Sequence, residues 1–151
     1  MYSTRLDTYG RGCMHDCSYF YAKSLLSFRG LWDAQDSAVA DIGKIERKLE
    51  KLPQGTILRL GGMTDCFQPT ELEHRVTLET IKLLNAYGIG YLIVTKSDLA
   101  ADDLYMDAMD KELAHIQVTV TCVDDEFYKN AGYEKAPLPS RRIGWKNIGT
   151  D

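Results

Sequence analysis

TILRLGG, residues 56–62, sets the architecture of this chain. Its first five residues are a short apolar run with β-branched side chains, which predicts a buried strand, and the two glycines end that strand. Two further runs of the same kind follow, YLIVT at residues 91–95 and IQVTVTCV at residues 116–123. We therefore predict three successive strands in this part of the chain.

Helical patterns separate these strands. Residues 37–52 place apolar side chains at steps of three and four, and a Pro-Gln-Gly sequence ends the pattern. Residues 70–87 form the clearest helix, in which Thr70 and Glu73 are spaced as a capping box and Gly88 is the expected stop. Ser97 is the expected cap of a helix that runs to about residue 113.

With a weaker strand at residues 2–9, the order of elements is an alternation of strands and helices. Such an alternation is typical of parallel β/α units joined by right-handed crossovers. A complete eight-fold β/α barrel takes roughly 250 residues, whereas this chain has 151. We therefore expect one α/β domain over residues 1–151, a partial (half) barrel of about four parallel units, with an irregular tail over residues 124–151.

Composition limits the classes of partner. The chain is 44% hydrophobic and 26% charged. Its net charge is −4, so we expect no general electrostatic attraction to nucleic acid or to an anionic membrane. We predict no membrane segment, and the first seven residues lack the pattern of a signal peptide. The expected compartment is the cytoplasm, where clustered cysteines are more often metal ligands or catalysts than disulfides.

Polar residues follow the predicted strands, where parallel β/α folds carry their chemistry. A glycine-flanked loop holds Cys13, His15 and Cys17, and Cys66 follows a later strand. Two thiols at a strand end could ligate a soft metal, with His15 and Cys66 as further ligands, but zinc needs four ligands and an iron–sulfur cluster at least three thiolates. The alternative is that these cysteines are ordinary buried side chains.

Several segments resemble a known family when taken in order. YGRGCMHDCSYFYA, residues 9–22, is similar to the cluster loop of radical S-adenosylmethionine enzymes, in particular the branch that resembles spore photoproduct lyase. GGMTDCFQPTE at residues 61–71, VTKS at residues 94–97 and VTVT at residues 118–121 are similar to later segments of that branch. The resemblance extends over roughly residues 9–142.

The resemblance implies a chemistry and a set of site residues. In that family three thiolates hold a 4Fe–4S cluster, whose open iron binds S-adenosylmethionine, and reduction of the cluster cleaves this cofactor. It assigns Cys13 and Cys17, and as a substitute Cys66, to the metal. The positions that it places at S-adenosylmethionine are Tyr19, Gly61, Gly62, Met63, Asp65, Lys96, Ser97 and Thr119.

One position departs from the family pattern, because Phe20 stands where the family has its third cysteine. Three explanations remain open: a relative that has lost the reaction, a third thiolate supplied by Cys66, or a single recent or engineered substitution. The alternative function is a non-catalytic module that binds S-adenosylmethionine or a nucleotide, or a Cys/His metal-binding module. Only the family resemblance points to a substrate class, and that class is nucleic acid. An open sheet edge favours a homodimer.

Overall fold

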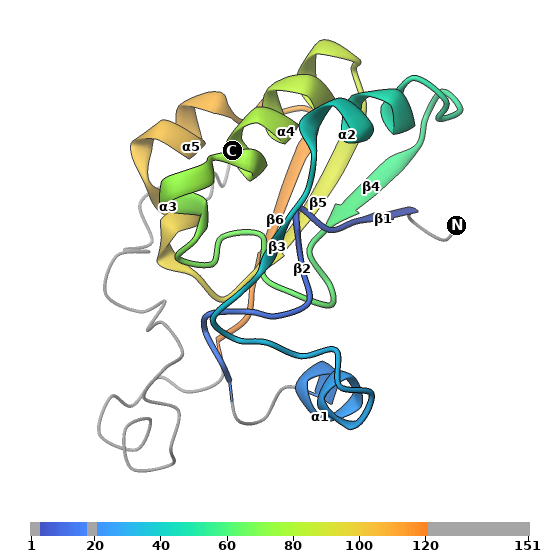
Figure 1. Cartoon of the computed structure of the whole chain (residues 1–151). Helices are drawn as coiled ribbons and strands as arrows, with labels where there is room; N and C mark the ends of the chain where they lie inside the picture. Colours follow the sequence, from blue (N-terminus) through green and yellow to red (C-terminus); the bar gives the residue numbers. More distant parts are fainter. Residues whose placement is uncertain (1–3, 18–20, 121–151) are drawn as a thin grey trace.

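The computed structural model describes residues 4–17 and 21–120, and its centre is a four-stranded parallel sheet (Figure 1). The strands, in their order across the sheet, are β1 (Thr4–Leu6), β4 (Ile57–Leu60), β5 (Gly90–Thr95) and β6 (Ala114–Val118). Across the sheet, the four strands stand in the same order in which they occur in the sequence. The prediction of an α/β domain with parallel strands is confirmed.

Helices lie over one side of this sheet. The principal ones are α2 (Ile42–Leu49), α4 (Val76–Ala86) and α5 (Asp103–Ala108), and α4 packs against both of the others (Figure 1). A single 3₁₀ turn, η1 (Asp98–Ala101), precedes α5. Among the described residues, no helix has the length and apolar character needed to cross a bilayer.

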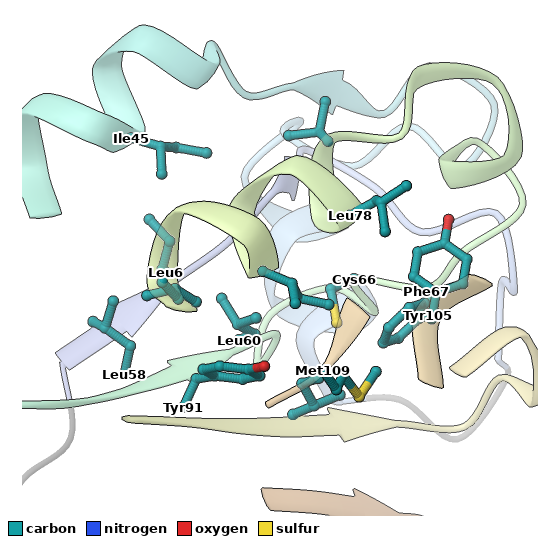
Figure 2. Close-up of a cluster of buried hydrophobic side chains, with 14 of the residues drawn as sticks. Leu6, Ile45, Leu58, Leu60, Cys66, Phe67, Leu78, Tyr91, Tyr105 and Met109 are labelled. Carbon is teal, nitrogen blue, oxygen red and sulfur yellow. The ribbon is translucent and has the colours of Figure 1, made fainter. Parts of the chain in front are cut away.

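The two faces of the sheet differ in burial. Along β4 and β5 the side chains alternate between buried and more exposed positions, as the two-residue period of a strand requires. Leu58, Leu60, Tyr91 and Ile93 are fully buried, and together with side chains of the helices they form the core (Figure 2). The face turned away from this core is partly open, with Ile57 and Arg59 exposed.

Smaller elements flank one end of the sheet. Strand β2 (Tyr9–Gly10) pairs antiparallel with β3 (Ala38–Val39). Helix α1 (Tyr21–Phe28) follows the loop that carries the cysteines, and α3 (Glu71–His74) is a single turn before α4. These elements place residues 8–17 beside residues 64–77, and hydrogen bonds join the two segments.

The bounds predicted for the helices at residues 37–52 and 97–113 are wrong. The helix expected over residues 37–52 begins at Ile42, because Asp41 caps it with a 2.8 Å bond from the Lys44 amide. The helix expected from Ser97 to residue 113 divides into η1 and α5, because Asp102 accepts from the Leu104 amide and starts a new helix. Ser97 does cap η1, as predicted.

The capping box expected at Thr70 and Glu73 is also wrong. The Thr70 side chain caps nothing, and the helix is interrupted at Arg75, whose φ of 54° is left-handed. Glu71 supplies the cap instead, because its carboxylate accepts the amides of Thr77 and Leu78 at the start of α4. Gly88, with a φ of 63°, does end the helical region.

Two strand predictions also need correction. The strand expected over residues 2–9 divides into β1 and β2, which belong to different sheets. The strand expected from Ile116 begins two residues earlier, at Ala114, and β6 ends at Val118. Residues 121–123 of that prediction, and the tail expected over residues 124–151, lie outside the described residues.

Candidate functional site

Asp65 joins three segments at the end of the sheet where the strands finish, which we call the carboxyl edge. Its Oδ1 accepts the Thr95 hydroxyl at 2.6 Å and the Phe67 amide at 2.9 Å. Its Oδ2 accepts the Lys96 amide at 2.8 Å. The residue that follows β4 therefore holds the end of β5, with its carboxylate buried.

The third segment is the cysteine loop, residues 11–17. His15 of this loop is buried, and its Nε2 lies 3.7 Å from Asp65 Oδ2. That distance is too long for a hydrogen bond, and Nε2 finds no other hydrogen-bond partner among the described residues. Burial lowers the pKa of His15, and the nearby Asp65 opposes this shift.

Gln68 fixes the cysteine loop to the sheet. It is fully buried, and its Oε1 accepts the Met14 amide at 2.9 Å and the Ser37 hydroxyl at 2.8 Å. Gly12 is needed at the same place for a different reason. A Cβ on Gly12 would lie 1.7 Å from the backbone oxygen of Asp33, so only glycine lets the two backbones approach this closely.

The three candidate metal ligands occupy two different environments. Cys13 and Cys17 are buried in the loop, and burial raises the pKa of the Cys13 thiol to about 11. Cys66 belongs to the core cluster, where Figure 2 shows it with Leu60 on one side and Tyr105 on the other. Burial raises the pKa of its thiol well above the usual value. In the described residues, no three His, Cys, Asp or Glu side chains are grouped so that they could hold a metal ion.

A three-thiolate cluster does not fit this set of donors. The loop offers two thiols, and Phe20, at the third family position, has no atom that ligates iron. Cys66 is fully buried in the core cluster, and it is not grouped with the loop donors as a metal site would require among the described residues.

Most of the predicted cofactor positions do gather at the carboxyl edge. Gly61 has a φ of 77°, and a Cβ there would lie 3.1 Å from the Val94 oxygen, so the turn after β4 requires glycine. Gly62 and Met63 follow and are half-buried. Ser97 is buried, Lys96 is half-buried, and the Thr119 amide donates to the Thr95 oxygen at 2.9 Å.

Other predicted residues lie outside the described part of the chain. These are Tyr19 and Phe20. Tyr21, which also matches the family segment, is exposed at the start of α1.

Sequence reasoning gave no role to Gln68 or Glu71. Both are fully buried polar side chains, and Glu71 accepts four hydrogen bonds, from the hydroxyls of Tyr9 and Tyr105 and from two amides of α4. FQPTE, residues 67–71, carries no local signal of this burial, because three of its five residues are polar and their partners lie in distant segments. Comparisons of the chain with protein-family models, curated proteins and solved structures gave no match.

Proposed function

We propose that this chain is a radical S-adenosylmethionine-like protein that binds S-adenosylmethionine at the carboxyl edge of its parallel sheet. With Phe20 in place, it lacks the reductive cleavage that the family carries out. The observation that carries the proposal is the Asp65 contact set, because it brings together the cysteine loop, the end of β4 and the end of β5. These are the segments in which the family resemblance lies.

The chemistry of this edge suits a zwitterionic nucleoside ligand. Both carboxylate oxygens of Asp65 accept hydrogen bonds from other residues of the chain. Its role is therefore to position the segments around the ligand. The turn at residues 61–63 presents backbone groups for an amino group, and the Lys96 side chain offers a cation for a carboxylate. Chemistry at the carboxyl ends of parallel strands is the general rule for such sheets.

The strand order supports the proposal of a partial barrel. Each connection adds the next strand on the same side of the strand before it. The principal helices lie on one side of the sheet, as in the wall of a β/α barrel. Within residues 4–17 and 21–120, β6 is an edge strand with Ile116 exposed, and we expect a second copy of the chain to cover this edge.

Titration calorimetry of the iron-free protein tests the binding proposal. We expect S-adenosylmethionine to bind with one site per chain, and adenosine or methionine alone to bind more weakly. Asp65→Asn should reduce the affinity, whereas Asp107→Asn on the exposed side of α5 should not. The absence of binding at millimolar S-adenosylmethionine would contradict the proposal.

Anaerobic reconstitution with iron and sulfide tests the role of Phe20. We expect the native chain to take up fewer than the about four irons of a complete cluster. Phe20→Cys should raise the iron content and produce the broad brown absorbance of a cluster, and Phe20→Ser serves as the control. If Phe20→Cys takes up no more iron than Phe20→Ser, the assignment of this loop to the family is wrong. One zinc per native chain would favour the Cys/His metal module instead.

A further inference from the structure

Two arginines lie side by side on the partly open face of the sheet. Arg5 of β1 pairs in register with Arg59 of β4, so the two side chains leave the sheet on the same face. Both are exposed, while their neighbours Leu6 and Leu60 are buried on the opposite face. Adjacent strands are about 4.8 Å apart, and like charges placed opposite each other destabilise a sheet. The pair is therefore a feature that the fold alone does not favour.

Both side chains run toward the carboxyl edge. A Cβ built on Gly62 would lie 3.0 Å from Arg5 Cδ and 3.8 Å from Arg59 Nε, so the two arginines meet at the turn after β4. This turn belongs to the candidate site, in which Gly61, Gly62 and Met63 are predicted cofactor positions. The cationic pair is thus next to the proposed S-adenosylmethionine site.

The surrounding charges leave the pair electropositive. Asp7 Oδ2 lies 2.9 Å from Arg5 Nε and neutralises one charge. Lys48 brings another positive charge, since its Nζ donates to the Arg5 backbone oxygen at 3.1 Å. In the described part of the chain, Arg59 has no acidic partner. The two guanidinium groups against one carboxylate leave an excess of one positive charge at the pair.

We infer that Arg5 and Arg59 form a subsite for the phosphate monoester group of a small substrate. A guanidinium presents a planar set of donors that matches phosphate oxygens, and two of them side by side match a dianion. A phosphate monoester carries a charge of about −1.5 to −2 at pH 7. The bound anion also relieves the repulsion between the two arginines. The inference rests on the proposed function only in naming the phosphate-bearing molecule as the substrate beside S-adenosylmethionine.

The chain as a whole favours a small ligand over a nucleic acid. Its net charge is −4. Binding to a nucleic-acid backbone uses several lysines and arginines along a path, which this face does not offer in its described residues. A single phosphate at the carboxyl edge is the occupant that the geometry fits.

Nuclear magnetic resonance of ¹⁵N-labelled protein with inorganic phosphate tests the subsite directly. We expect the Nε–Hε signals of Arg5 and Arg59 to shift together and to saturate with a common dissociation constant. Arg59→Gln should weaken phosphate binding about tenfold, and Arg59→Lys should weaken it less, because the charge remains while the planar donor set is lost. Asp7→Asn should strengthen binding, because it removes the competing carboxylate.

The control is Arg47→Gln, an exposed arginine of α2 whose loss changes the net charge by the same amount. It should leave phosphate affinity unchanged, and a dispersed amide spectrum confirms that each variant is folded. Equal weakening by Arg47→Gln and Arg59→Gln would overturn the subsite, as would the absence of any shift at Arg5 and Arg59.

Two further ligands separate the remaining outcomes. A nucleoside 5′-monophosphate should bind at least as tightly as phosphate, and tighter binding of a phosphodiester oligonucleotide would overturn the small-substrate inference. S-adenosylmethionine affinity should be unchanged in Arg59→Gln, because the two subsites are distinct. If phosphate binds at the arginines but S-adenosylmethionine does not bind at all, the proposed function fails and the anion subsite stands.

Discussion

Two buried carboxylates, Glu71 and Asp65, hold this fold together in different ways. Glu71 is completely buried and accepts four hydrogen bonds, so its environment is complete within the chain. Asp65 accepts three and lies beside a buried imidazole whose Nε2 finds no partner in the described residues. The difference indicates that Glu71 serves the fold, whereas the surroundings of Asp65 agree with our proposal that this residue positions segments around a ligand.

The largest expected effect is that of Glu71→Gln on stability. The amide nitrogen of glutamine cannot accept a hydrogen bond, so buried donors at the start of α4 or on the tyrosines lose their partner. We expect the free energy of unfolding to fall by about 2–3 kcal/mol. Urea denaturation measures this loss, and Glu73→Gln, an exposed neighbour, is the control, with an effect below about 0.5 kcal/mol.

Glu71→Gln should leave ligand binding unchanged, because Glu71 bonds only to groups of the fold. S-adenosylmethionine affinity, measured on the folded fraction of Glu71→Gln, should equal that of the native chain. A loss of affinity as large as the loss of stability would erase the distinction between the two carboxylates.

Asp65→Asn should have a smaller effect on stability and a larger one on binding. One of its oxygens becomes a donor and faces the Lys96 amide or the Thr95 hydroxyl, which we expect to cost about 1–2 kcal/mol. The same change loosens the junction of the cysteine loop with β5, so ligand affinity should fall about tenfold. Calorimetry and urea denaturation on the same sample check both numbers. Unchanged affinity in a folded Asp65→Asn variant would contradict the role given to this residue.

Tyr105→Phe should weaken the Glu71 cluster by about 1 kcal/mol. The Tyr105 hydroxyl donates to Glu71 at 2.8 Å and accepts from Arg75 Nη1 at 3.0 Å, so it links a cation to the buried carboxylate. Phenylalanine keeps the edge-to-face contact of this ring with Phe67, whose centroid is 5.0 Å away. Thermal unfolding should therefore show a modest shift, and an effect as large as that of Glu71→Gln would mean that the Tyr105 hydroxyl carries most of the stabilisation that we assign to Glu71.

A third carboxylate, Asp7, gives the smallest expected effect, and it depends on pH. Burial raises its pKa above the usual 3.8, against the opposing effect of Arg5. The folded state therefore holds a proton more tightly than the unfolded state, and Asp7 lowers stability as pH rises through the raised pKa. Relative to Asp7→Asn, the native chain should lose stability as the pH rises from 3.8 toward neutral. Urea denaturation of both proteins across this range checks the sign, and a difference that grows with pH in favour of the native chain would contradict it.

The sheet could be predicted from the sequence because each interior strand is encoded locally. Residues 56–60 and 91–95 are short apolar runs ended by turn signals, and the parallel alternation follows from the helices between them. It also follows that the polar residues after these strands share one edge. The contacts of Asp65 with His15 and Thr95 could not be predicted, because they depend on the tertiary placement of the loop.

The helix bounds failed for a related reason. The pattern at residues 70–87 reads as one helix, but Glu71 is drawn to Tyr9 and Tyr105, which are 62 and 34 residues away in sequence. Those tertiary hydrogen bonds outweigh the local capping box and interrupt the helix at Arg75. Local patterns predict elements well here, and buried polar contacts between distant segments decide where the elements begin and end.

The most direct test of the account is the map of backbone amide shifts when S-adenosylmethionine is added to the ¹⁵N-labelled, iron-free protein. We predict that the shifted residues cluster at the carboxyl edge, at Gly61–Met63, Lys96, Ser97 and Thr119, while α2 and the Glu71 cluster stay unchanged. Shifts confined to a different surface, such as α1, or no shifts at millimolar ligand would contradict the assignment of this edge as the binding site.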